Sequence, residues 1–181
     1  YRVVPVYYEA FADAIEAVYG RRITLPQVLR FGSWVGGDMD GNPNVNAETI
    51  RAALDAQRAQ AIAQYRADLR ALGNMLTQSL GRVGVDEAVV ARTDAYIEQL
   101  PEAAARLRPR LADMPYRRLL DMMKARLALA AEGDGKGYAS AREFIADLEL
   151  IDASLANHRG EHAGRFALQR VLWRARTFGF H

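Results

Sequence analysis

The residues best suited to chemistry lie in one short stretch, residues 31–44, which reads FGSWVGGDMDGNPN. Within it Asp38, Asp40 and Asn42 carry side-chain oxygens at alternating positions, a spacing that can converge on a hard cation such as calcium. The EF-hand pattern nevertheless fails, because Pro43 occupies the position at which the sharp turn of such a loop requires glycine. The three oxygen-bearing side chains still leave a metal-binding domain of another kind as one alternative.

The paired glycines of the same stretch, Gly36 and Gly37, raise the possibility of a phosphate cradle. Neither G-x-G-x-x-G nor a closing Gly-Lys-Ser/Thr is present, and the two carboxylates that follow would repel a phosphate group. By residue type the cluster is typical of a surface loop. Trp34 argues for more than a loop, because this large aromatic residue stands just ahead of the two glycines, separated from them by Val35, and glycines let the backbone approach another group closely.

Histidines and arginines elsewhere in the chain give weaker indications. His158 and His162 match the H-x-x-E-H spacing of a zinc-protease motif, but that motif needs a carboxylate ligand further along, and no Asp or Glu follows His162. This pattern is therefore interpreted as a junction between helices, without a metal site. Arginines also gather within 106–110 and 117–126, and such runs are typical of solvated helix faces.

Taken as one string, residues 31–45 resemble the F-x-S-W-M-G-G-D-R-D-G-N-P-N-V block of phosphoenolpyruvate carboxylases. Two further segments follow in matching order: residues 114–117 resemble an E-P-Y-R segment of that family, and residues 168–181, which include Arg174 and the run RTFG, resemble its R-R-V-R-T-F-G segment. The chain departs from the family pattern at Met39, where the family usually has Arg.

The resemblance implies that residues 1–181 are an internal fragment of a longer cytoplasmic enzyme that joins bicarbonate to phosphoenolpyruvate. By the same resemblance the parent enzyme is expected to be a homo-oligomer, namely a tetramer. The products are oxaloacetate and phosphate, and Mg²⁺ or Mn²⁺ assists. The family's catalytic histidine motif and its glycine-arginine loop have no counterpart here. The isolated chain is therefore expected to be inactive and to bind no metal. The residues that the resemblance assigns to the catalytic face are Trp34, Gly36, Gly37, Asp38, Met39, Asp40, Gly41, Asn42 and Pro43, with Arg174 facing an anion.

The spacing of apolar residues predicts a mainly α-helical chain with one or two short barrel strands. One strand is expected near 28–35, where it would lead into the glycine-rich loop 31–45, and a second at the C-terminal end. The long-helix region then occupies 46–181. Its helices are expected from Asn46 over about thirty residues, after Asp86, from Pro115, over 140–159 and over 162–176, in addition to a first helix at 3–19.

The composition narrows the class of protein. The net charge of +2 gives little support for binding nucleic acid, and the absence of cysteine excludes disulfides and thiolate metal sites. No apolar run approaches the ~18 residues of a membrane span, so no membrane partner is expected. Besides the carboxylase fragment, two alternatives remain: a non-catalytic helical interaction module, and a metal-binding domain on Asp38, Asp40 and Asn42.

Overall fold

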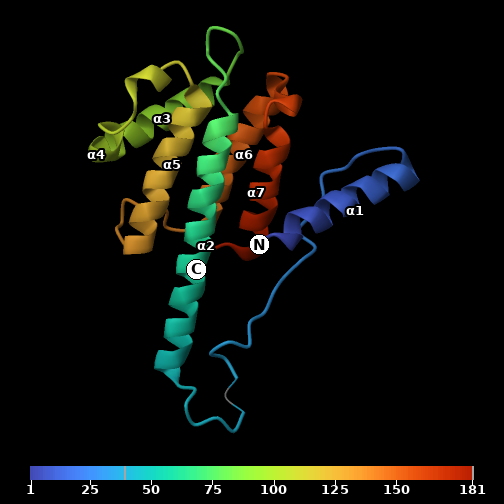
Figure 1. Ribbon diagram of the computed structural model, residues 1–181, viewed down its shortest axis with the longest axis vertical. Coiled ribbons are helices and arrows are strands. Elements are labelled where there is room, and N and C mark those ends of the chain that lie inside the picture. Colours follow the sequence, from blue (N-terminus) through green and yellow to red (C-terminus); the bar gives the residue numbers. More distant parts are fainter. Residues whose placement is uncertain (39, 181) are drawn as a thin grey trace.

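The computed structural model describes residues 1–38 and 40–180 and is mainly α-helical, as the sequence predicts (Figure 1). In chain order the elements are α1 (Val3–Tyr19), α2 (Ala47–Met75), α3 (Glu87–Gln99), α4 (Pro101–Ala104), the 3-10 turn η1 (Pro109–Leu111), α5 (Pro115–Glu132), α6 (Ala141–Asn157), the 3-10 turn η2 (Gly160–His162) and α7 (Arg165–Phe178). The C-terminal half of α2 runs through a bundle of α3, α5, α6 and α7, and its N-terminal half extends beyond them (Figure 1).

Helix α2 begins at the expected cap. The side-chain oxygen of Asn46 accepts hydrogen bonds from the backbone N–H groups of Glu48 and Thr49, each at 3.0 Å. These bonds satisfy two of the donors that a helix start leaves unpaired. The buried residues of α2 begin only at Ala61, so its first turns project from the bundle next to the glycine-rich loop.

The bundle core draws on α2, α5, α6 and α7, with α5 as its largest contributor. Leu119, Met122, Met123 and Leu127 of α5 are fully buried, so the face of this helix that carries Met and Leu belongs to the core. Phe144 of α6 lies among them, also fully buried. Burial of such side chains is the main favourable contribution to folding, at about 1.5–3 kcal/mol each.

The arginines within 117–126 were expected on a solvated helix face, and for Arg126 this expectation is wrong. Arg126 belongs to the core. Only 7% of it is exposed, and its guanidinium carbon lies 4.7 Å and 4.1 Å from the ring centroids of Tyr96 and Tyr138. Both tyrosines donate their hydroxyl hydrogens to the buried carboxylate of Asp147, at 2.7 Å and 2.6 Å. Arg126 itself pairs with Glu143 at 3.1 Å. The two aromatic faces and this carboxylate together explain how its charge is accommodated in the core.

The expectation of one or two short strands is also wrong, since the described residues contain no strand. Residues 28–35 are irregular, and at the C-terminal end α7 continues to Phe178. A strand forms only where a neighbouring strand pairs with its backbone. Here the N–H groups of Val28 and Leu29 donate instead to the hydroxyl of Tyr8, at 3.0 Å and 3.3 Å.

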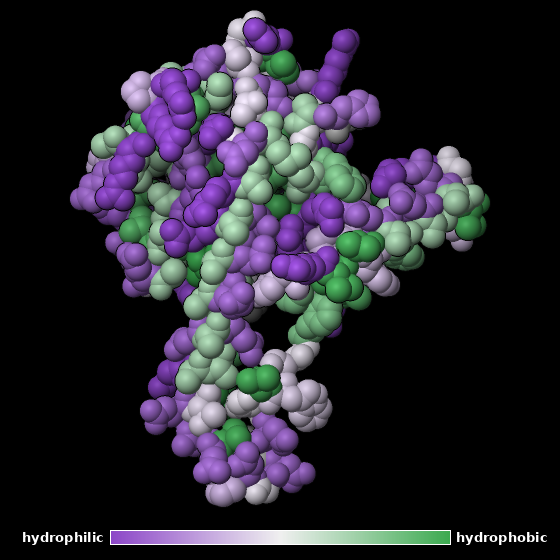
Figure 2. Space-filling model, viewed as in Figure 1, coloured by the Kyte–Doolittle hydropathy of each residue, from purple (hydrophilic) through white to green (hydrophobic). Residues whose placement is uncertain are grey.

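Helix α1 projects sideways from the bundle and contacts it through α7 (Figure 1). Tyr8 is buried and stacks on Trp173, with ring centroids 5.6 Å apart. Phe11 and Val18 lie on the same stripe but are 37% and 74% exposed. Hydrophobic side chains are accordingly visible on this projecting arm in Figure 2. None of the helices in the described part of the chain is both long and apolar enough to cross a membrane.

Candidate functional site

The glycine-rich loop, residues 31–45, lies at the free end of α2, and its residues 31–38 and 40–45 are almost all exposed (Figure 1). Trp34 is 83% exposed. Its carbonyl oxygen accepts a hydrogen bond from the N–H of Gly37 at 3.1 Å, and the hydroxyl of Ser33 accepts one from the N–H of Val35 at 3.2 Å. A tight turn therefore presents the indole ring to the outside of the chain.

Gly36 fixes this turn against α2. Its φ is +73°, a conformation that side chains disfavour, and an added Cβ would lie 2.6 Å from the Cβ of Ala53. Gly41 also has a positive φ, +70°, but an added Cβ there would meet nothing within 4 Å. Gly36 is thus required both by the backbone conformation and by the close approach to the helix, whereas Gly41 is required by conformation alone.

The polar residues of the loop form local turns. One carboxylate oxygen of Asp38 accepts a hydrogen bond from the N–H of Asp40 at 3.2 Å, and the side-chain oxygen of Asn42 accepts one from the N–H of Asn44 at 3.0 Å. Asx turns of this kind shape a loop without help from a ligand. Met39, at which the chain departs from the family pattern, lies outside the described residues.

A divalent cation finds no complete set of ligands in the described residues, which bring together no group of three His, Asp or Glu side chains. Two carboxylates and one amide are available on the loop, and Asp38 and Asn42 already accept backbone hydrogen bonds. A Mg²⁺ or Mn²⁺ site normally draws on several oxygen ligands in near-octahedral geometry. The residues of this segment therefore do not fit such a metal by themselves.

A cavity of about 1000 Å³ opens between the start of the loop, the free half of α2, α6 and the chain end after α7. Residues 31–33 line one wall and residues 176–180 another. The rings of Phe31 and Phe178 stack with centroids 5.2 Å apart and an angle of 15° between their planes. Two segments that are about 145 residues apart in the sequence, and that both carry a family-like motif, therefore meet at one cavity.

Basic side chains dominate the charges of this cavity. Its lining includes Arg30, Arg58, Arg142 and Arg176, with Glu149 as the acidic residue. Arg176 pairs with Glu149 at 2.7 Å, and Arg58 donates to a backbone carbonyl of α5 at 2.8 Å. Arg30 and Arg142 are exposed and have no ion pair within 1–38 and 40–180. An excess of guanidinium groups suits an anionic ligand.

Sequence reasoning missed this basic set. Arg176 stands in the RTFG run, but Arg30, Arg58 and Arg142 belong to no motif. They come from the connector before the loop, from α2 and from α6, and only the packing of those elements brings them together.

Arg174, which the resemblance places facing an anion, lies between α2 and α7. Its Nη1 is 3.3 Å from the Oδ1 of Asp68, and the two side chains are 14% and 11% exposed. Burial raises the pKa of the Asp68 carboxyl, although Arg174 acts in the opposite direction. Within the described chain the anion that Arg174 faces is this carboxylate, and the pair joins the two helices.

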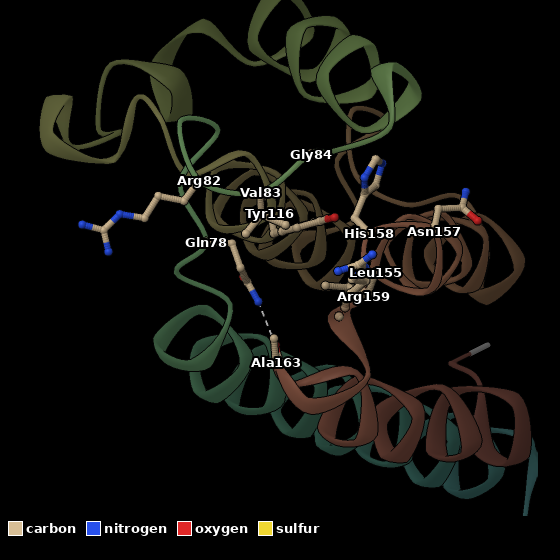
Figure 3. Close-up of a pocket in the computed structure, with 11 residues that line it drawn as sticks. Gln78, Arg82, Val83, Gly84, Tyr116, Leu155, Asn157, His158, Arg159 and Ala163 are labelled. Carbon is tan, nitrogen blue, oxygen red and sulfur yellow. Dashed lines mark hydrogen bonds between the residues drawn. The ribbon is translucent and has the colours of Figure 1, made fainter.

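The histidine pattern falls at the junction of α6 and α7 (Figure 3). The Nε2 of His158 lies 2.9 Å from a carboxylate oxygen of Asp86. Its ring also packs on Gly84, where an added Cβ would lie 2.5 Å from Nδ1. Figure 3 shows His158 beside Tyr116 at a cavity of about 410 Å³, and His162 is exposed in η2. Through these contacts with Gly84 and Asp86, His158 joins the loop before α3 to the end of α6.

Comparison with known proteins gives one consistent family. A sequence profile described as phosphoenolpyruvate carboxylase matches residues 1–181. The phosphoenolpyruvate carboxylase of Xanthomonas campestris pv. campestris (strain 8004) is 51% identical over 181 residues, which cover 100% of this chain and 20% of the relative. That of Burkholderia mallei (strain SAVP1) is 36% identical over 192 aligned residues, covering 94% of this chain and 18% of the relative. The chain spans about a fifth of the length of these relatives. Because the profile matches the whole sequence, the chain belongs to the phosphoenolpyruvate carboxylase family.

Proposed function

We propose that this chain is part of a phosphoenolpyruvate carboxylase, a cytoplasmic lyase that converts phosphoenolpyruvate and bicarbonate into oxaloacetate and phosphate. The family match over all 181 residues is the observation that carries the proposal. The packing of residues 31–33 beside 176–180 supports it, because the two family-like segments line one basic cavity.

The charges of the cavity suit the proposed chemistry. A bicarbonate oxygen attacks the phosphorus of phosphoenolpyruvate, and the bond from phosphorus to the enol oxygen breaks to give carboxyphosphate and an enolate. The methylene carbon of the enolate then forms a bond to the carboxyl carbon, and phosphate leaves. Every species in this sequence is an anion, so guanidinium groups such as those of Arg30 and Arg142 would offset negative charge during the transfer.

The loop is proposed to act at the catalytic face through its exposed side chains. Trp34, Asp38 and Asp40 make few contacts with the rest of the described chain, which leaves them available to substrate or to other segments of a longer polypeptide. Gly36 would hold the turn in place on α2 while these side chains project from it.

The rest of the machinery is proposed to lie elsewhere in the full-length polypeptide. Mg²⁺ or Mn²⁺ would need ligands from other segments, since the described residues do not gather three acidic or histidine side chains. The 181-residue chain alone is expected to be inactive, because it spans a fifth of its relatives. The parent enzyme is proposed to be a homotetramer.

The test uses the full-length protein. Oxaloacetate formation is measured with phosphoenolpyruvate, bicarbonate and Mg²⁺, and each is then omitted in turn. We expect turnover only with all three present, and we expect Asp38→Asn to lower kcat by at least ~10-fold, the smaller end of effects seen when a group that supports a site is removed. Asp94→Asn is the matched control, because Asp94 is an exposed carboxylate on α3, away from the loop.

Two negative results would have different meanings, because one concerns the role of the loop and the other concerns the reaction. Wild-type turnover in Asp38→Asn would remove the loop from the catalytic site and leave the reaction assignment intact. A wild-type protein that forms no oxaloacetate under these conditions would reject the reaction itself.

A further inference from the structure

The start of α2 contacts the glycine-rich loop at two points, and Thr49 takes part in both. The side-chain hydroxyl of Thr49 donates a hydrogen bond to the backbone carbonyl of Asn44 at 3.0 Å. The backbone carbonyl of the same residue lies beside Gly36, where an added Cβ would be 3.3 Å from its oxygen. One residue of the helix therefore contacts both ends of segment 36–44, which carries the polar side chains of the loop.

The hydrogen bond from the Thr49 hydroxyl reaches outside the helix. A threonine hydroxyl within a helix commonly bonds to a carbonyl three or four residues earlier in the same helix. Asn44 lies five residues earlier, before the helix begins at Ala47. The side-chain oxygen of the cap residue Asn46 is also 3.2 Å from this hydroxyl, but a hydroxyl has only one hydrogen to donate. The shorter contact, to Asn44, joins the end of the loop to the helix.

Gly36 lies on the same helix and extends the contact by one turn. Thr49 and Ala53 are four residues apart, so they share one face of α2. An added Cβ at Gly36 would lie 2.6 Å from the Cβ of Ala53. The close approach at Gly36 and the hydrogen bond at Asn44 are thus two separate attachments of one loop to the first two turns of α2.

The helix that carries these attachments is itself joined to the bundle. It runs unbroken from Ala47 to Met75, and its buried residues begin at Ala61. Between the loop and the bundle, Arg58 donates a hydrogen bond to the backbone carbonyl of Ala130 in α5 at 2.8 Å. A site supported by a helix is held more precisely than one supported by a loop. The position of the loop relative to the bundle is therefore set through the start of α2.

We propose that Thr49 is a positioning residue, whose hydroxyl keeps segment 36–44 on α2 so that Asp38 and Asp40 stay at the catalytic face. Thr49 acts through the carbonyl of Asn44 and not on the reacting atoms. The inference rests on the proposed carboxylase function, in which the side chains of this loop act at the catalytic face. It requires the hydroxyl of Thr49 and not the shape of the side chain, because the contact with Asn44 is a hydrogen bond.

The experiment compares two substitutions in the full-length protein. Thr49→Val keeps the branched shape but replaces the hydroxyl with a methyl group, whereas Thr49→Ser keeps the hydroxyl and loses the methyl group. We expect Thr49→Val to lower kcat for oxaloacetate formation at least ~10-fold, because a displacement of about 1 Å within a site can cost ~100-fold. Thr49→Ser should keep the wild-type kcat. Thr77→Val is the matched control, since Thr77 is an exposed threonine beyond the other end of α2, and it should also keep the wild-type kcat.

Hydrogen–deuterium exchange of the same proteins reports on the loop independently of activity. Peptides covering 40–46 should exchange faster in Thr49→Val than in the wild type or in Thr49→Ser, while peptides from α5 and α6 should not change. The inference is overturned if Thr49→Val keeps both the wild-type kcat and the wild-type exchange of 40–46. It is also overturned if Thr49→Ser is impaired as much as Thr49→Val, because packing and not the hydroxyl would then matter.

The activity of the wild type distinguishes these failures from a failure of the proposed function. An active wild type with an unaffected Thr49→Val would reject the positioning role alone. A wild type that forms no oxaloacetate would reject the carboxylase function, and the positioning role with it.

Discussion

At the scale of single residues, Gly36 and Gly41 have nearly the same backbone conformation, with φ of +73° and +70°, but different surroundings. Alanine at either position adds the strain of a positive φ, about 1–2 kcal/mol. At Gly36 it also adds an overlap with Ala53, whose Cβ would lie 2.6 Å away. We expect Gly36→Ala to lower the free energy of unfolding of the chain by at least ~1 kcal/mol more than Gly41→Ala, as measured by urea denaturation. Equal losses would mean that the loop does not rest on α2.

The residue types of the loop were sufficient to predict its turns, because Gly, Asn and Asp favour turns wherever they occur. They were not sufficient to predict its neighbours. Arg30, Arg58 and Arg142 reach the cavity from separate elements, and no spacing along the chain encodes that meeting. Arg126 shows the same limit, since its charge indicated solvent while Tyr96 and Tyr138 enclose it.

At the scale of elements, the helices were predictable because their starts and stops are local. Asn46 caps α2, Pro115 opens α5, and Gly133 ends α5 with a positive φ. Strands depend on a partner that sequence pattern alone does not supply. Residues 28–35 have β-forming side chains, but two of their backbone donors bind Tyr8, so the prediction of a strand was wrong.

The contact between α2 and α7 gives a prediction about pH. Burial raises the pKa of Asp68 above its ordinary value of 3.8, and this outweighs the opposing effects of Arg174 and of the hydrogen bond from Gln64. The folded chain therefore holds this proton more tightly than the unfolded chain does. The stabilising contribution of Asp68 is then fully present below pH 3.8 and is lost as the pH rises through the folded value.

We accordingly expect the free energy of unfolding of the wild type, relative to Asp68→Asn, to increase as the pH falls from about 7 to about 4. Urea denaturation at a series of pH values measures this difference. Asp55→Asn is the matched control, since Asp55 is an exposed carboxylate of the same helix. A difference that stays constant, or that shrinks toward acid pH, would contradict the raised pKa.

At the scale of the whole molecule, a well-packed bundle carries an arm of α1 and a loop whose large apolar side chains are exposed (Figure 2). Its two tryptophans represent these two environments. Trp173 is half-buried and stacks on Tyr8, whereas Trp34 is 83% exposed. A solvent-exposed tryptophan contributes little to the stability of the chain that carries it, so selection for stability within this segment does not explain Trp34.

Substituting each tryptophan in turn therefore distinguishes an effect on the stability of the chain from an effect on the activity of the full-length enzyme. Trp34→Ala should change the free energy of unfolding of the 181-residue chain by no more than ~0.5 kcal/mol, because the ring is exposed. Trp173→Ala should lower it by about 2–3 kcal/mol, somewhat less than the loss for a fully buried ring. In the full-length protein we expect Trp34→Ala to reduce oxaloacetate formation although the protein remains folded by circular dichroism. If Trp34→Ala instead destabilises the 181-residue chain as much as Trp173→Ala does, the loop packs on this segment and is not held out toward a catalytic face.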